Sequence, residues 1–459
     1  MIKLPIFWHI LSLIFLSPPM TYICKSGGTL EHRPLSSGDT CPCDSPEWDR
    51  SVFTQTMQTK YGILCDKKWI VSFSQSVVYV GALIGALSFG FLSDKFGRLF
   101  MLSMSCLVLA TSGCLVAFMP TIWTFIFMRC IEGIGFGGAI VTAFVLCVEY
   151  CGVNYREVVT ALFHIPLNVS HMSLPGLSYL LRDCDTFQIV LSVPGFLGVA
   201  LWWLLLESPK WLVDSNNLEK ATIVMQKIAA FNKYPTDKMK ADMESYFSKT
   251  ESSTVAKVSF WKIFRYRSMT INLICMSIIF FVCGMGYYGV SQYIGKMSGN
   301  IHMNVAISGA VLIPGSLVAA YCLKTFGRRS FLMTTNFLSG IFMITVIIIP
   351  STAVLARVVI ACICNCFFFM SFIIVFLYGV ELFPTSIRSS VLGFLSLLSR
   401  LGQINAPFVN SLPESVSGAI FGFMAILGGC LCYPLPETKN IDLPTTLEEA
   451  SNLPRGSSK

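Results

Sequence analysis

The sequence predicts an all-α membrane protein in which twelve spanning helices form two six-helix bundles. Of its 459 residues, 54% are hydrophobic and only 13% are charged, whereas about a quarter of the residues in a soluble domain are charged. The chain contains about twelve apolar runs near the length of roughly 20 residues that a helix needs to cross a bilayer. Charged motifs also recur at about half the chain length, so that Gly97-Arg98 returns as Gly327-Arg328 after 230 residues.

The predicted helices divide evenly between the two halves. In the first half they cover residues 4–22, 69–93, 99–118, 122–147, 158–181 and 186–206. In the second half they cover residues 268–294, 304–323, 330–350, 352–378, 389–411 and 417–435. The first run also has the lysine, the short apolar stretch and the following small residues of a signal peptide. We favour a retained helix, because a six-plus-six repeat needs one there.

The loops predict the domain boundaries and the orientation. The short loops that hold the repeated motifs are rich in Lys and Arg, which is typical of cytoplasmic loops; these residues are Lys95, Arg98, Arg156, Lys324, Arg328, Arg329 and Arg388. We therefore expect a first bundle at 1–206 with an extracellular loop at 23–68, a cytoplasmic linker at 207–267, a second bundle at 268–435 and a cytoplasmic tail at 436–459. The protein would cross the plasma membrane several times, with both termini in the cytoplasm.

The cysteines and the net charge fit the same picture. Fourteen of the 18 cysteines lie in or beside apolar runs, where Cys acts as a small hydrophobic residue more often than as a metal ligand. The other four, Cys24, Cys41, Cys43 and Cys65, share the predicted extracellular loop, and an even number there predicts two disulfides. The net charge of +8 lies in loops between apolar runs, which favours membrane orientation over nucleic-acid binding.

The repeated motifs predict conformational latches at the cytoplasmic end. Glycines allow tight turns and close backbone approach, and carboxylates can bond a helix N-terminus or a neighbouring Arg. The spacing of seven between Glu149 and Arg156 recurs between Glu381 and Arg388 and predicts paired ionic latches. The alternative is that the glycines of these motifs form simple turns and that the charged side chains only extend into water. The predicted latch residues are Gly90, Asp94, Gly97, Arg98, Glu149, Arg156, Glu207, Gly327, Arg328, Glu381 and Arg388.

Ionisable residues inside the predicted spans are costly and therefore indicate function. Arg129 and Glu132 are three apart on one helix and should neutralise each other, and Arg357 repeats Arg129, so we expect all three to be structural. Arg400 has no charged counterpart in the first half, so we expect it to contact a substrate.

Aromatic and polar residues of neighbouring spans could complete such a substrate site. Tyr287 and Tyr288 are adjacent in the seventh span, and Phe372 and Phe376 share a face of the tenth. His164, Asn168 and His171 fall on one face of the fifth span. Ordinary core packing is the alternative for all of these residues.

Several other classes of site are excluded by context. Gly133, Gly135 and Gly138 match G-x-G-x-x-G, but no strand precedes them, so we expect no dinucleotide site. The glycine pairs Gly81/Gly85 and Gly133/Gly137 instead predict close helix packing. No Walker motif, catalytic triad or His-rich cluster is evident, so we expect no enzyme activity, no cofactor and no metal site.

The motifs resemble those of a known family. The chain is similar to the major facilitator superfamily, and specifically to solute carrier family 22, through CDKKWIVSFSQSVVYVGALIGALSFGFLSDKFGR, ESPKWLV, YYGVSQYIGKMSGNIHMN, LKTFGRR and YGVELFPTSIR. The resemblance covers nearly the whole chain, although the N-terminus and the first extracellular loop are shorter than usual. It implies the superfamily fold, with Tyr287, Phe372 and Phe376 at aromatic positions of the cavity. Anion carriers of this family have an Arg where this chain has Arg400, cation carriers have an Asp there, and anion carriers also have a Lys where this chain has Ser316.

The predicted function is transport of a small organic ion across the lipid bilayer by alternating access. The Arg at position 400 favours an organic anion or zwitterion, and an organic cation or carnitine-like substrate is the near alternative. A transport-inactive membrane sensor or scaffold is the alternative from another class. The expected partners are the substrate and the bilayer, with no nucleic acid.

Overall fold

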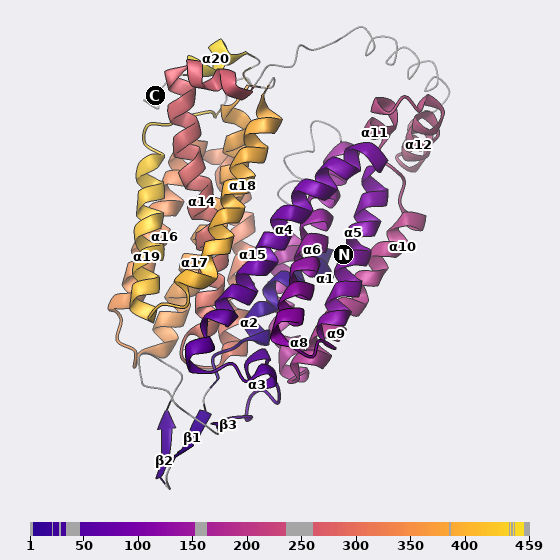
Figure 1. Ribbon diagram of the computed structural model, residues 1–459. Helices are drawn as coiled ribbons and strands as arrows, with labels where there is room; N and C mark the ends of the chain where they lie inside the picture. Colours follow the sequence, from indigo (N-terminus) through magenta and orange to yellow (C-terminus); the bar gives the residue numbers. More distant parts are fainter. Residues whose placement is uncertain are drawn as a thin grey trace.

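Two bundles of long helices lie side by side in the computed structural model (Figure 1). The structure describes residues 3–20, 22–26, 29–33, 46–151, 163–235, 260–384, 387–439, 441, 444 and 446–453. The predicted helix at 4–22 corresponds to α1 (Lys3–Leu11) and α2 (Leu13–Leu16). The rest of the first bundle consists of α4 (Trp69–Phe96), α5 (Arg98–Val116), α6 (Ile122–Tyr150), α8 (Ile165–Leu180), and α9 (Cys184–Ser192) with α10 (Leu197–Leu204).

The second bundle repeats this arrangement with straighter helices. It consists of α14 (Arg267–Lys296), α15 (Ile301–Thr325), α16 (Arg328–Ile348), α17 (Val354–Leu382), α18 (Arg388–Val409) and α19 (Glu414–Leu431). Most ends lie within a few residues of the predicted ones, because an apolar run bounded by charges defines a spanning helix almost by itself. The fold class predicted from the sequence is therefore confirmed.

Shorter elements mark the two ends of the bundles. At one end, β1 (Tyr22–Ser26) pairs antiparallel with β2 (Thr29–Arg33) and β3 (Pro46–Trp48), a small sheet that the sequence did not predict. At the other end lie α11 (Pro209–Asp214), α12 (Leu218–Phe231) and α20 (Leu447–Ser451). We call these the sheet end and the motif end, because the repeated charged motifs lie at the second (Figure 1).

Three of the helical segments are less suited to crossing a membrane alone. Among the described residues, nine helices are long and apolar enough to span a bilayer, and Lys3–Leu16 is a shorter apolar segment. The remaining helices, α8 and α18, carry buried polar side chains, including His171 on α8 and Gln403 on α18. Helices that place polar groups inside a bundle can be less hydrophobic, because those groups do not face lipid.

Glycines bring neighbouring helices into backbone contact, as the sequence predicted for Gly81/Gly85 and Gly133/Gly137. On α6, a Cβ added to Gly137 would lie 2.8 Å from the carbonyl carbon of Ala82 on α4. Gly81 and Gly85 face the backbone of α6 in the same way. Such close approach is available only to residues without a side chain, so this prediction is confirmed.

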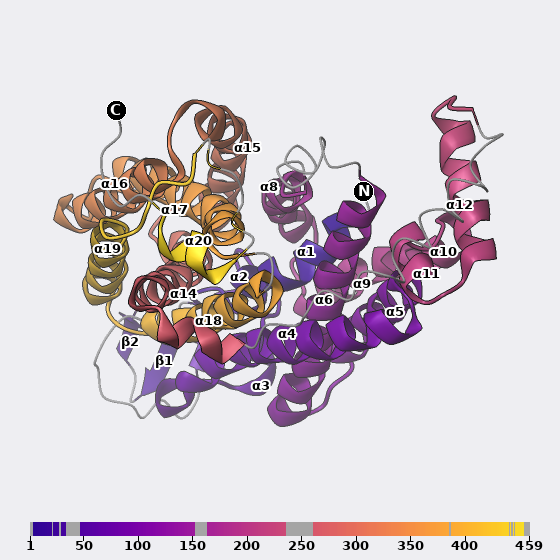
Figure 2. The same cartoon turned by 90° about the horizontal axis from the view of Figure 1, so that it is seen from above.

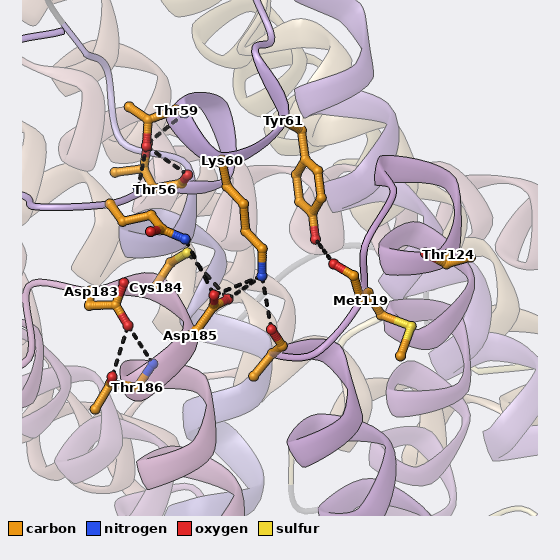
Figure 3. A network of polar contacts seen from close by, with 12 residues as sticks. Thr56, Thr59, Lys60, Tyr61, Met119, Thr124, Asp183, Cys184, Asp185 and Thr186 are labelled. Atoms are coloured by element: carbon orange, nitrogen blue, oxygen red, sulfur yellow. Dashed lines mark hydrogen bonds and ion pairs between the residues drawn. The ribbon is translucent and has the colours of Figure 1, made fainter.

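The segment from residue 46 to residue 68, which we call the cap segment, is fastened to the first bundle (Figure 3). On its short helix α3 (Met57–Tyr61), Lys60 Nζ lies 2.7 Å from each carboxylate oxygen of Asp185 and donates to the carbonyl of Ala117 at 2.8 Å. The Tyr61 hydroxyl donates to the carbonyl of Met119 at 2.9 Å. Burial and the nearby Asp185 raise the pKa of Tyr61 above its ordinary value, so this phenol stays protonated and keeps donating at physiological pH.

The four exterior cysteines, Cys24, Cys41, Cys43 and Cys65, were predicted to form two disulfides, with the pairing left open. Cys24, Cys41 and Cys43 lie outside the side chains that the structure describes, so the two disulfides stay a prediction.

The two bundles touch each other where α4 lies beside α18 and where α8 lies beside α15 (Figure 2). The Ser76 hydroxyl on α4 donates to the carbonyl of Ile404 on α18 at 2.7 Å. His302 of α15 packs between Phe15 and Phe53, with ring centroids 5.6 and 5.5 Å away. These contacts close the sheet end in this conformation.

Candidate functional site

The first set of predicted latch residues forms one connected network at the motif end. Arg98 Nε lies 3.3 Å from Glu149 Oε2, and its Nη1 lies 2.8 Å from Asp94 Oδ1. Glu207 accepts hydrogen bonds from the backbone N–H groups of Arg98 and Leu99 at 2.9 and 3.0 Å. A carboxylate at this position stabilises the N-terminus of α5.

Glycine is required at the turn that begins this network. Gly97 has a φ of +103°, and a Cβ there would lie 2.5 Å from Glu207 Oε2. Gly90, one helical turn before Asp94 on α4, has open space, with Val141 as its nearest neighbour at 4.0 Å. The carboxylate of Asp94 is 71% exposed and could bond another group.

The second half repeats the network with matching residues. Arg328 Nε lies 3.1 Å from Glu381 Oε2, and Glu437 accepts from the Arg328 N–H at 2.7 Å. Gly327 packs against the carboxylate of Glu437. This arrangement gives the predicted repeat a physical meaning, because in each half a glutamate caps the helix that begins with the motif Arg.

One detail of the predicted latches differs from the structure. Glu381 pairs with Arg328 rather than with Arg388, whose Nε donates to the carbonyl of Phe383 at 3.1 Å. Arg156 lies outside the described residues. The spacing of seven therefore does not mark the ion pair in the second half, since residues seven apart across a helix end need not face each other. The latch role of these residues stays a prediction.

Sequence reasoning missed one further repeated contact. The hydroxyl of Tyr150 donates to the carbonyl of Leu206, and the hydroxyl of Tyr378 donates to the carbonyl of Pro436. The two tyrosines are 228 residues apart, so the repeat itself was the signal that could have found them.

The intramembrane charges of the first half neutralise each other. Arg129 Nη1 lies 2.9 Å from Glu132 Oε2, and both side chains are at most 1% exposed. Two residues that the sequence did not single out complete the cluster: His9 Nδ1 lies 2.5 Å from Glu132 Oε1, and Gln188 donates to the same oxygen at 3.0 Å. The two charges that were expected to neutralise each other are therefore paired, and the structural role of Arg129 and Glu132 stays a prediction.

Arg357 is also neutralised, by a residue that the sequence left unassigned. Its Nη2 lies 2.7 Å from Glu414 Oε1 at the start of α19, and its Nε donates to the carbonyl of Val346 at 3.3 Å. The hydroxyl of Tyr293 lies 3.3 Å from the same carboxylate oxygen. Arg357 is therefore paired in this structure, and its structural role stays a prediction.

Arg400 differs from these arginines. Its Nη1 donates to the neutral Gln403 Oε1 at 3.1 Å, and the phenols of Tyr288 and Tyr79 are the ionisable groups that face it. Within the part of the chain that the structure describes, no carboxylate forms an ion pair with Arg400. Arg98, Arg129, Arg328 and Arg357 all have one, so Arg400 is a cation available to bind an anion.

The predicted aromatic residues form one cluster around Tyr287. Tyr287 lies 4.9 Å from Tyr288 and 5.7 Å from Phe372 between ring centroids, and Phe372 lies 5.4 Å from Phe376. Phe369, which the sequence analysis did not name, lies 5.3 Å from Tyr287. The Tyr287 hydroxyl is buried without a hydrogen-bond partner among the described residues. Aromatic faces and a free donor next to a cation can hold a flat organic anion.

The polar residues of α8 divide between the aromatic cluster and the contact between the bundles. The ring of His164, at the start of α8, lies 6.2 Å from Phe369. Asn168 donates across the bundles to the carbonyl of Leu312 at 3.2 Å. His171 is buried, and neither ring nitrogen has a partner among the described residues. His164 therefore lies closest to the predicted site, and Asn168 joins the two halves.

Comparisons with known proteins agree with this architecture. Residues 45–450 match the protein family described as "Sugar (and other) transporter". Relatives include "Organic cation transporter protein" of Drosophila melanogaster, 29% identical over 92% of this chain and 78% of that protein. "Solute carrier family 22 member 3" of Rattus norvegicus is 29% identical over 92% and 76%, and "Organic anion transporter 3" of Oryctolagus cuniculus is 30% identical over 91% and 78%.

A solved structure has the same fold. The inward open conformation of the xylose transporter XylE from E. coli superposes with a TM-score of 0.70 at 17% sequence identity, covering 98% of this chain and 97% of that one.

Proposed function

We propose, from the premise that this chain belongs to the sugar (and other) transporter family and among its members to solute carrier family 22, that it carries small organic anions or zwitterions across a membrane. The relatives named above include organic cation and organic anion transporters, so the overall similarity does not choose between charges. The choice rests on the residues around Arg400.

The observation that carries the proposal is the absence of a carboxylate partner for Arg400 among the described residues. A charge held away from water is costly unless it is paired; Arg400 is half-buried, and the chain pairs the buried arginines Arg129 and Arg357 with Glu132 and Glu414. A substrate carboxylate would supply the missing counter-charge. The aromatic rings of Tyr287 and Phe372 would hold the apolar body of the same molecule.

Alternating access supplies the mechanism. Contacts such as Ser76 with Ile404 close the sheet end, so a substrate at Arg400 would exchange with the motif end. Opening of the sheet end would require these contacts to break and the halves to rock. The exposed carboxylate of Asp94 could then bond the other half and latch the motif end. A gradient or an exchanged ion would provide the energy.

The orientation and location follow from the charges. The motif end carries Arg98, Arg328 and Arg329, and positive loops face the cytoplasm. We therefore propose a multi-pass plasma-membrane protein with the motif end and both termini in the cytoplasm and the sheet end outside.

A cation or carnitine-like substrate is the second candidate, because aromatic faces such as those of Tyr287, Tyr288 and Phe372 also attract cations. A zwitterion would use both the rings and Arg400.

The test is a competition uptake panel in a heterologous cell, with radiolabelled benzoate and unlabelled anionic, cationic and zwitterionic competitors. We expect saturable benzoate uptake that Arg400→Gln and Arg400→Asp abolish at unchanged surface level. Benzoate uptake that survives Arg400→Asp would contradict the anion assignment. A chain that takes up no probe in saturable fashion would instead fit the sensor or scaffold alternative.

A further inference from the structure

Tyr79 lies opposite Arg400, on the other bundle. It belongs to α4 of the first half and is 1% exposed. Its ring meets that of Tyr288 edge-on, with centroids 5.7 Å apart at 72°. Its hydroxyl accepts a hydrogen bond from Gln292 Nε2 of α14 at 3.1 Å. Ser76, one turn before Tyr79 on α4, donates to the carbonyl of Ile404, one turn after Arg400 on α18, at 2.7 Å, so Tyr79 and Arg400 lie at the same level of the contact between the bundles.

The hydrogen bonds around Tyr79 leave its own proton to be placed. A tyrosine hydroxyl accepts and also donates one hydrogen bond, and Gln292 occupies the accepting side. Arg400 cannot accept, because a guanidinium has only donors, and it lacks a carboxylate partner among the described residues. An anion placed between the two residues would accept hydrogen bonds from both the Tyr79 hydroxyl and the N–H groups of the Arg400 guanidinium.

We propose that Tyr79 is a specificity-determining residue whose hydroxyl donates to the anionic group of a substrate held by Arg400. This inference rests on the proposed function, since it needs an anion at Arg400. The anion would then touch α18 of one half and α4 of the other. Because the same phenol bonds Gln292 across the interface, the anion adds a second contact between the halves at the level of the site.

The same residues define the class of substrate more narrowly. One guanidinium beside the two phenols of Tyr79 and Tyr288, whose rings lie 5.7 Å apart, matches a single negative charge. The described hydrogen-bond partners of Arg400 and Tyr79, which are Gln403 and Gln292, carry no positive charge. A second carboxylate on the substrate would therefore lack a cation there, and we expect an aromatic monocarboxylate to bind better than a dicarboxylate.

A purely structural role for Tyr79 makes a different prediction, so two variants separate the ideas. Tyr79→Phe removes the hydroxyl and keeps the ring on Tyr288. Gln292→Met removes the same cross-bundle hydrogen bond but keeps the Tyr79 hydroxyl. Tyr61→Phe in the cap segment is a matched control, because its hydroxyl bonds Met119 far from Arg400.

The experiment measures KM and maximal rate for radiolabelled benzoate in cells, normalised to surface protein. Hydrogen bonds to charged groups are worth more than neutral ones, so we expect Tyr79→Phe to raise KM about tenfold with little change in maximal rate. Gln292→Met should raise it less, and Tyr61→Phe should not change it. Inhibition by the neutral isostere benzamide should be the same in Tyr79→Phe and the wild type, and phthalate should compete more weakly than benzoate.

Equal KM changes in Tyr79→Phe and Gln292→Met would overturn the role of Tyr79, as would equal weakening of benzoate and benzamide. Stronger competition by phthalate would overturn the monocarboxylate class. If Tyr79→Phe reaches the surface poorly, the thermal shift that benzoate produces in the purified variants gives the same comparison. Benzoate uptake that survives Arg400→Gln, or a wild type that neither transports nor binds benzoate, would instead refute the proposed function.

Discussion

Replacing Gly137 by Ala should destabilise the first bundle, because the added methyl group has no room. It would lie 2.8 Å from the carbonyl carbon and 2.9 Å from the Cα of Ala82. Carbon atoms pack at about 3.5–4.0 Å and the carbonyl oxygen of Ala82 would lie closer still to the methyl group, so α4 and α6 must separate, since backbone atoms cannot rotate away. Overpacking of this kind costs about 1–3 kcal/mol, and the upper end applies because Gly81, Gly85 and Gly133 share the contact.

The intrinsic preference of Ala for helices offsets part of that cost, by about 1 kcal/mol. We therefore expect a net loss of about 2 kcal/mol. Gly176→Ala on α8 and Gly393→Ala on α18 are matched controls, since nothing lies within 4 Å of a Cβ at either position. Both should leave stability unchanged or raise it by up to about 1 kcal/mol.

The assay follows the fraction of detergent-solubilised protein that stays monodisperse after heating. The midpoint for Gly137→Ala should fall below that of the wild type, while the midpoints of the two controls should not. If Gly137→Ala matched Gly393→Ala, backbone contact between α4 and α6 would not be what holds these helices together.

Four further substitutions test other parts of the structure. Glu132→Gln leaves the buried Arg129 without its counter-charge, so the same heating assay should show a loss of about 3–5 kcal/mol; a wild-type midpoint would contradict the structural role. Asp94→Asn and Glu381→Gln should slow benzoate uptake at normal surface level, and unchanged uptake would exclude latches. Lys60→Met removes the ion pair with Asp185 and should speed protease cleavage of the cap segment in intact cells; equal cleavage rates would mean that other contacts hold the segment.

The sequence predicted most of the fold because hydrophobicity and charge act locally. An apolar run bounded by Arg98 or Arg328 specifies where a helix starts, whatever surrounds it. The repeat also singled out Glu207, which caps the N-terminus of α5, because its counterpart Glu437 appears in a matching segment. The sheet formed by β1, β2 and β3 was not predicted, since its strands are short and polar.

Only some residues of the candidate site could be predicted from the sequence, for a related reason. Arg400 and the aromatic residues stand out because a charge or a cluster of rings is unusual in its own helix. His9, Glu414 and Tyr79 carry no such local signal, and each gains its role from a partner on another helix: Glu132, Arg357 and the opposite bundle. Contacts of that kind depend on how helices pack, which hydropathy does not encode.

The fastening of the cap segment has a mechanical consequence. Its described polar contacts, through Lys60 and Tyr61, join it to the first bundle, whereas Phe53 meets the second bundle through the ring of His302. Hydrogen bonds and ion pairs are directional, so they hold the cap segment in a fixed orientation, whereas contact between two aromatic rings allows them to slide past each other. The cap segment should therefore move together with the first bundle as one rigid unit. Its Phe53 ring should slide over the ring of His302 when the second bundle rotates.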